Sequence, residues 1–74
     1  MNITHLEAAL DSSTIDRIRY DGKELRLFVR FHNGITYAYA KVDPILVLQL
    51  LLADSAGKFF IANIRDSHAV VKLP

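Results

Sequence analysis

Residues 31–44 read Phe-His-Asn-Gly-Ile-Thr-Tyr-Ala-Tyr-Ala-Lys-Val-Asp-Pro, and this stretch decides the fold. Asn33-Gly34 can adopt the positive φ angles that a tight hairpin turn requires. The alternating residues of 35–40 suit the pleat of a β-strand. Asp43 and Pro44 are typical of the N-cap and first position of a helix. The stretch therefore predicts a hairpin whose second strand leads directly into a helix.

Upstream of this stretch, β-branched residues and alternation predict strands over residues 14–20 and 24–32, joined by a turn at Asp21-Gly22. Downstream, residues 43–53 predict a helix, residues 54–57 break it, and residues 58–65 predict a second helix. The expected inward stripe of this second helix consists of Phe60, Ile61 and Ile64. The predicted fold is α+β, a single domain over residues 1–74, in which two helices cover one face of a three-stranded antiparallel meander.

The two ends of the chain give weaker signals. Thr4-His5-Leu6-Glu7 fits a capping box, and apolar residues follow it at helical spacing, namely Ile3, Leu6, Ala9 and Leu10. These residues predict a short N-terminal helix. Residues 68–73 are expected either to add an edge strand or to remain unpaired.

The register of the hairpin decides which side of the sheet the tyrosines face, because a shift of one residue reverses every side chain. A two-residue loop pairs His32 with Ile35 and places Tyr37 and Tyr39 on the face of Phe28. A three-residue loop closed by Gly34 instead places the tyrosines on the opposite, apolar face. That face would consist of Leu25, Leu27, Val29, Phe31, Ile35, Tyr37 and Tyr39. The second register is favoured because it gives the clean alternation of a half-solvated sheet.

The remaining face of the sheet carries the best functional clue. Arginines alternate outward around the exposed ring of Phe28, namely Arg17, Arg19, Arg26 and Arg30. Arginines around an aromatic ring are typical of sheets that bind single-stranded RNA through phosphate contacts and base stacking. The alternative interpretation is that these arginines keep the sheet soluble and pair with nearby acids, such as Asp16, Glu24 or Asp66.

Composition excludes several function classes. With 74 residues, no cysteine and a net charge of +1, the chain offers no disulfide or thiolate metal site and little overall attraction for nucleic acid. No stretch is long enough to span a membrane and no signal peptide is evident, so we expect a cytoplasmic protein. The histidines are scattered, the serines lack a nucleophile motif, and Gly57-Lys58 lacks a phosphate-binding loop. We therefore expect no enzymatic activity, no catalytic residue, no metal and no cofactor.

Several short motifs resemble the KTSC domain over about residues 12–70. They run in the order Ser13, Ile18, Tyr20-Asp21, Leu27-x-Val29-x-Phe31-x-x-Gly34-x-x-Tyr37-x-Tyr39-x-x-Val42, Ala53-x-Ser55-x-Gly57-x-x-Phe60 and Ile64-Arg65. The hallmark of that family is the central Tyr-x-Tyr, carried here by Tyr37 and Tyr39. The domain occurs alone in small bacterial and phage proteins and at the C-terminus of some lysyl-tRNA synthetases. The resemblance therefore implies binding to single-stranded RNA or tRNA.

One departure from the family pattern suggests a different function. The helix over residues 44–53 has apolar side chains nearly all round, including Ile45, Leu48 and Leu52 where the family has polar residues. A domain of this size cannot bury such a helix on every side. An exposed apolar stripe usually marks a partner interface. The sequence therefore also predicts a protein-association module, either a homodimer or an accessory subunit.

Overall fold

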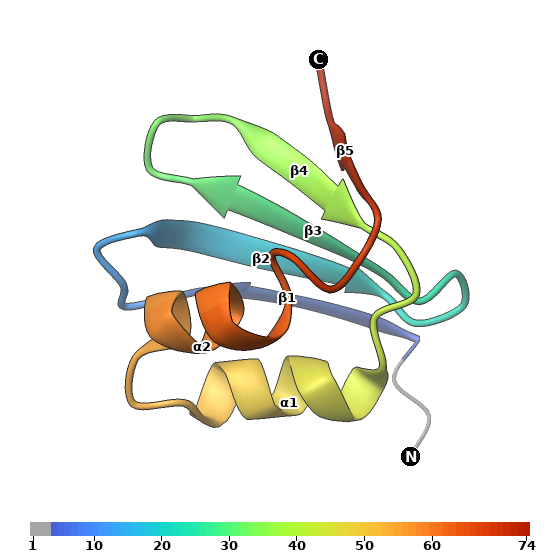
Figure 1. The fold of residues 1–74 in the computed structure, drawn as a ribbon, viewed down its shortest axis with the longest axis horizontal. Coiled ribbons are helices and arrows are strands. Elements are labelled where there is room, and N and C mark those ends of the chain that lie inside the picture. The colour runs from blue at the N-terminus through green and yellow to red at the C-terminus, as the bar shows by residue number, and fades with distance from the viewer. Residues whose placement is uncertain (1–3) are drawn as a thin grey trace.

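The computed structural model describes residues 4–74, and within them the chain forms one antiparallel sheet and two helices (Figure 1). The helices are α1 (Pro44–Leu52) and α2 (Ala56–Asn63). The strands lie in the sheet in chain order and are β1 (His5–Ala9), β2 (Ile15–Asp21), β3 (Arg26–Phe31), β4 (Thr36–Tyr39) and β5 (Val70–Lys72). The predicted α+β class is confirmed, and the predicted three-stranded meander is the middle of this larger sheet.

The central hairpin has the register that the three-residue loop predicts. The Phe31 N–H donates to the Ile35 carbonyl at 3.0 Å, and Gly34, with a φ of 86°, donates its N–H to the Phe31 carbonyl at 2.9 Å. Glycine adopts this left-handed conformation without a steric penalty. Val29 consequently pairs with Tyr37, and the tyrosines face the helices. Tyr39 is buried in the core, while Tyr37 is half-buried.

The prediction of an N-terminal helix is wrong, because His5–Ala9 forms strand β1 along the edge of β2. Leu6 and Ala8 alternate toward the core, whereas Ile3 of the expected helical stripe lies outside the described residues. A helix this short is only marginally stable in water. The same residues gain a full ladder of hydrogen bonds to β2, so sheet pairing overrides the capping-box signal.

Helix α1 begins where the sequence predicts. The Asp43 carboxylate accepts a hydrogen bond from the Ile45 N–H at 2.8 Å, with Pro44 in the first helical turn. Helix α2 begins at Ala56, two residues earlier than expected, because Ser55 caps it by accepting from the Lys58 N–H at 3.3 Å. Neither α1 nor α2, the helices of the described residues, has the length and apolar character needed to cross a membrane.

The core lies between the sheet and the helices. Its fully buried members come from every layer and are Ile15, Ile18, Tyr20, Leu27, Val29, Val42, Val47, Leu50 and Ile64, with Phe60 and Tyr39 nearly as deep. Three side chains expected here lie outside the core, and one of them, Ile35, is half-buried. Leu25 sits in the β2–β3 turn with a φ of 53° and is 39% exposed, and Ile61 of α2 is 45% exposed because α2 presents Phe60 and Gly57 to the core instead. The tail residues 70–72 form the edge strand β5, one of the two outcomes that the sequence left open.

Candidate nucleic-acid interface

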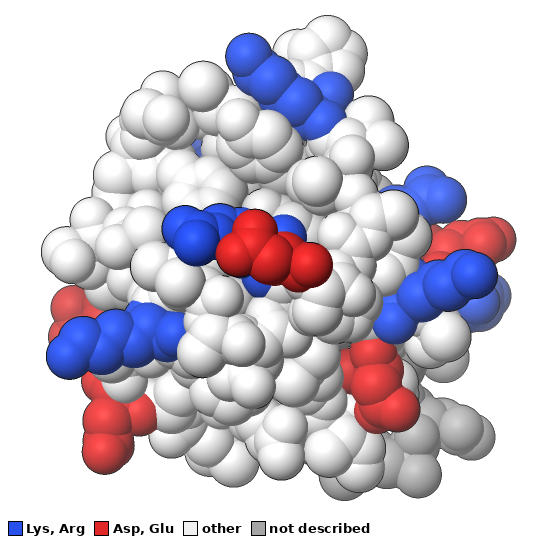
Figure 2. Space-filling model, viewed as in Figure 1, with Lys and Arg blue, Asp and Glu red and all other residues white. Residues whose placement is uncertain are grey.

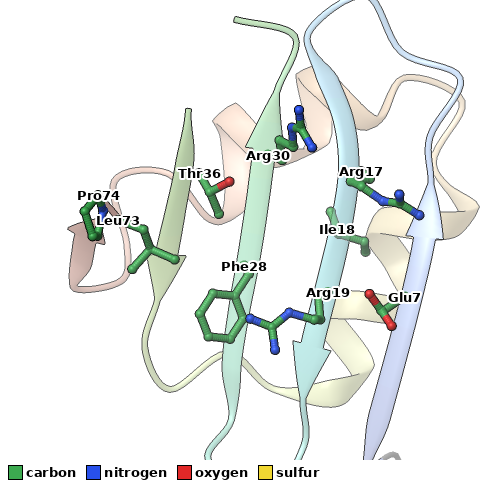
Figure 3. Close-up of a pocket in the computed structure, with 9 residues that line it drawn as sticks. All are labelled: Glu7, Arg17, Ile18, Arg19, Phe28, Arg30, Thr36, Leu73 and Pro74. Atoms are coloured by element: carbon green, nitrogen blue, oxygen red, sulfur yellow. The ribbon is translucent and has the colours of Figure 1, made fainter. Parts of the chain in front are cut away.

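The arginines predicted to line one surface do share the sheet face opposite the helices, and Figure 3 shows Arg17, Arg19 and Arg30 on it. Strand pairing places Arg19 across from Phe28 and Arg17 across from Arg30. Arg26 lies on β3 two residues before Phe28, and its side chain is therefore on the same side of the sheet. All of these arginines are exposed, and Phe28 is half-buried. We call this surface the open face; its predicted members are Arg17, Arg19, Arg26, Phe28 and Arg30.

Phe28 already has a cation on its ring. The guanidinium carbon of Arg19 lies 4.1 Å from the ring centroid, and the side chain extends across from β2 to reach it (Figure 3). A guanidinium at this distance is attracted by the negative face of the aromatic ring. The sequence predicted both residues on one face but not this contact. Arg19 is nevertheless exposed, so its guanidinium stays accessible to solvent while it lies over the ring.

Acidic residues lie close to the arginines. The Arg30 Nε approaches the Asp16 carboxylate at 3.7 Å, and both side chains are about half exposed. Glu7 lies opposite Arg19, and Asp21 lies opposite Arg26, in the strand register. Exposed pairs of this kind contribute at most about 1 kcal/mol each. They lower the net positive charge of the open face without holding the guanidinium groups tightly.

The centre of the open face is hollowed to a volume of about 280 Å³. Its lining includes four predicted residues and several that the sequence did not indicate, and consists of Glu7, Arg17, Ile18, Arg19, Phe28, Arg30, Thr36, Leu73 and Pro74. Arg26 borders a second hollow on the other side of Phe28, beside Val71 and Leu73. Glu7 was missed because β1 was expected to be a helix. Leu73 was missed because the sequence left the tail open between an edge strand and an unpaired end, although the alternation of Leu73 with Val71 favoured the strand.

The family-motif tyrosines lie on the other side of the sheet, within an aromatic cluster. The ring of Phe60 meets those of Phe31 and Tyr39 edge to face, with centroid distances of 5.6 and 5.3 Å. Burial raises the pKa of Tyr39, with the neighbouring Tyr37 adding to the effect. Within the described residues, Tyr37 and Tyr39 therefore belong to the packing of the core rather than to the open face.

Tyr20 also ties the sheet to the helices. Its hydroxyl donates to the Val42 carbonyl at 2.6 Å, just before α1 begins. Burial, with Asp43 and Asp21 nearby, raises the pKa of the Tyr20 hydroxyl above its ordinary value. Tyr20 is thus a neutral hydrogen-bond donor that fixes the entry into α1.

The second predicted surface, the stripe of Ile45, Leu48 and Leu52 on α1, is largely exposed. Ile45 is 56% exposed and Leu52 is 83% exposed, while Leu48 is half-buried. In the view that faces the helices, the middle of the surface over α1 is uncharged, with acidic side chains at its margins (Figure 2). The structure thus separates the two predicted surfaces onto opposite sides of the molecule.

The histidines of the described residues do not converge on a metal site. No group of three His, Asp or Glu side chains in residues 4–74 is arranged to hold a metal ion. His32 instead contacts the Ser12 carbonyl at 2.7 Å, and His68 contacts the Ser67 hydroxyl at 2.9 Å. Both histidines are explained by local structure.

The fold and the open face define a small α+β domain in which, within residues 4–74, helices cover one side of the sheet and leave the other open. A family model for the KTSC domain matches residues 11–68, more than half of the chain. The chain therefore belongs to the KTSC domain family, which confirms the resemblance seen in the sequence.

Relatives and a solved structure agree with this assignment. A protein from Stutzerimonas stutzeri described as uncharacterised is 38% identical over 60 residues, covering 81% of this chain and 84% of its own. A protein from Tsukamurella paurometabola is 36% identical over 64 residues, covering 86% and 96%. The crystal structure of a KTSC domain protein from Yersinia pestis matches with a TM-score of 0.87 at 28% identity, covering 95% of this chain and 99% of the other.

Proposed function

We propose that this protein is a non-enzymatic RNA-binding module whose open face holds single-stranded RNA, including single-stranded parts of tRNA. The observation that carries the proposal is the arrangement of two neighbouring cross-strand pairs. Arg17 faces Arg30, and in the next pair on the same face Arg19 faces Phe28. Like charges directly opposite each other destabilise a sheet. A phosphate placed between Arg17 and Arg30 would remove this repulsion.

The stacked Arg19–Phe28 pair supplies the second element of RNA recognition. Bases stack on aromatic rings and on guanidinium planes in single-strand binding proteins. A base can stack on the outer side of Arg19, or replace Arg19 on the Phe28 ring and release that guanidinium to a phosphate. Either mode reads the flat surface of a base rather than its edge. Binding should therefore depend little on sequence.

Salt dependence is the first test of this proposal. Four phosphate contacts would give a slope of roughly −3 in a plot of log K against log salt, at about −0.7 per contact on a single strand. Non-specific binding of this type has a Kd of roughly 1–100 µM at physiological salt. Fluorescence anisotropy of a labelled oligoribonucleotide, titrated at several salt concentrations, measures both quantities.

Matched variants locate the contact. Replacing Arg26 and Arg30 by Gln should halve the salt slope, because two phosphate contacts are lost. Replacing Lys58 and Arg65 by Gln removes the same charge from the helix side of the molecule and should leave the slope unchanged. The amide chemical shifts that change when RNA is added should belong to residues of β2 and β3. Shifts confined to α1 and α2, or the absence of binding even at low salt, would rule out the proposal.

A second candidate function is protein association through the α1 stripe, supported by the 83% exposure of Leu52. Ile45, Leu48 and Leu52 lie at helical spacing along one side of α1, so a partner helix or a second copy could cover them together. Leu52→Glu should abolish such association while leaving the fold intact, because the side chain already faces water. Light scattering of wild type and variant tests a homodimer, and co-purification with a tagged wild-type chain tests an accessory role.

A further inference from the structure

In the part of the chain that the structure describes, β5 is the last strand of the sheet and leaves one backbone edge open. The Ala69 carbonyl accepts a hydrogen bond at 2.9 Å from the N–H of Ala40, the residue after β4, and the Leu73 N–H donates one at 2.9 Å to the Thr36 carbonyl of β4. Because hydrogen bonding alternates along an antiparallel strand, the N–H and carbonyl groups of Val70 and Lys72 point away from β4. These groups are positioned to pair with one further strand.

We propose that the further strand is β5 of a second copy of this chain. A two-fold axis through Val71 places Val70 opposite the partner's Lys72, and Lys72 opposite the partner's Val70. These are the residues with outward-pointing backbone groups, so each pair exchanges two hydrogen bonds. The two sheets would join into one continuous sheet, with both open faces on the same side.

The side chains on the open face of β5 favour this pairing. Val71 is 64% exposed and would meet the partner's Val71 in the closely spaced type of cross-strand pair. Ala69 and Leu73 lie on the same side as Val71, and Leu73 would lie opposite the partner's Ala69. The seam on this face is therefore entirely apolar.

Charge complementarity favours the pairing on the helix side. Val70 is 47% exposed and borders a groove of about 400 Å³ whose wall includes Asp66. The side chain of the partner's Lys72 would lie next to Val70 on the helix side of the sheet. Its ammonium group would there be within reach of the Asp66 carboxylate. The Asp66 side chain is 79% exposed and lies 3.4 Å from the Arg65 guanidinium, so its carboxylate would be shared between Arg65 and this ammonium group.

The opposite edge of the sheet lacks this self-complementarity. In β1, Glu7 occupies the middle of the strand, and its backbone groups point outward by the same alternation. A two-fold axis that pairs the whole of β1 would place Glu7 opposite its own copy. Like charges in that position are destabilising. Self-pairing is therefore favoured at β5 and disfavoured at β1.

Single cysteines test the register directly, because the natural chain has none. In the proposed dimer, Val71→Cys places the new thiol opposite its own copy, at a Cα separation of about 4.5 Å that a disulfide accommodates. Val70→Cys is the matched control, since that thiol would face the partner's Lys72. Under mild oxidation, the Val71→Cys variant should form covalent dimers at least tenfold faster than Val70→Cys. Equal rates, or a faster rate for Val70→Cys, would overturn the proposal.

The native mass provides an independent test. Sedimentation of the wild-type chain should show a concentration-dependent dimer, and Val71→Lys should yield a folded monomer because two ammonium groups would meet at the axis. Leu52→Glu should leave this dimer unchanged, which separates it from association through α1. A wild-type monomer at the highest soluble concentration, or a dimer lost in Leu52→Glu but retained in Val71→Lys, would exclude pairing through β5. Circular dichroism verifies that each variant is folded.

Discussion

The two faces of the sheet are built from the same strands yet have opposite characters. On β3, Leu27 and Val29 are fully buried against the helices, while Arg26 and Arg30, which flank them in the strand, are exposed. Alternation along each strand produces this division. Stability should therefore reside on the covered face and binding on the open face, so that each can be altered without the other.

The largest expected effect comes from removing an aromatic ring from the covered face. Phe60→Ala should lower the free energy of unfolding by about 3–5 kcal/mol, because the ring packs between Phe31 and Tyr39. A chain of 74 residues has a total of only about 4–11 kcal/mol. Urea denaturation followed by circular dichroism should find the variant partly or wholly unfolded.

Phe28→Ala is the matched control for Phe60→Ala, since it removes the same ring from the open face. The half-buried ring of Phe28 covers little of the core, so its loss should cost well under half as much stability. Equal losses in the free energy of unfolding for both variants would contradict the inference that stability resides on the covered face. An RNA affinity reduced by about 1–3 kcal/mol in Phe28→Ala, with the salt slope unchanged, would strengthen the division.

A smaller effect is expected from Tyr20→Phe. The change removes the hydroxyl that bonds the Val42 carbonyl and leaves that carbonyl without its partner, which should cost about 1–3 kcal/mol. Denaturation at neutral pH measures this loss. A change below about 0.5 kcal/mol would show that the Tyr20–Val42 bond does not hold α1 to the sheet.

The same tyrosine predicts a dependence on alkaline pH. Burial, then Asp43 and Asp21, raise the pKa of folded Tyr20 above 10.0, its value in the unfolded chain. Above pH 10 the unfolded chain loses this proton while the folded chain retains it, so stability falls as pH rises from 10 toward the folded pKa. Below pH 10 this contribution is constant. In Tyr20→Phe the fall should be shallower, with the remainder due to Tyr39, whose pKa burial also raises.

Asp43→Ala should cost about 1 kcal/mol through the loss of the α1 cap. Asp54→Ala removes the same charge from the exposed loop between the helices and serves as the control. Chemical denaturation of both variants should show a loss only for Asp43→Ala. Equal effects would indicate that net charge, rather than the cap, accounts for the change.

Local signals with a specific conformational cause could be predicted from the sequence. The hairpin register follows from Gly34, whose positive φ the three-residue loop requires, and the start of α1 follows from Asp43 and Pro44. The residues of β1 are compatible with a helix and with a strand, and pairing with β2 selects the strand. No signal within five residues shows whether a neighbouring strand is available, so the sequence predicted a helix there.

The arginines and Phe28 of the candidate interface were predictable from the sequence, but their contacts and the other residues that line the hollow were not. Alternation sufficed to place Arg17, Arg19, Arg26 and Arg30 around Phe28. The stacking of Arg19 on Phe28 depends on the rotamer and on the cross-strand register, neither of which a pattern of residue types determines. The contribution of Leu73 required knowing that the tail pairs with β4.

The smallest expected effect concerns that stacked pair. Arg19→Gln, Phe28→Ala and the double variant form a thermodynamic cycle that isolates the interaction between guanidinium and ring. At this exposed site the coupling should be about 0.5–1 kcal/mol. A coupling near zero would mean that the stacked arrangement contributes nothing to the folded state, and Arg19 would then leave the ring to an incoming base at no cost. A coupling of the expected size means that a base must either compete with Arg19 for Phe28 or stack on the guanidinium itself. Arg19→Gln distinguishes these two modes, because it should strengthen base stacking in the first and weaken it in the second.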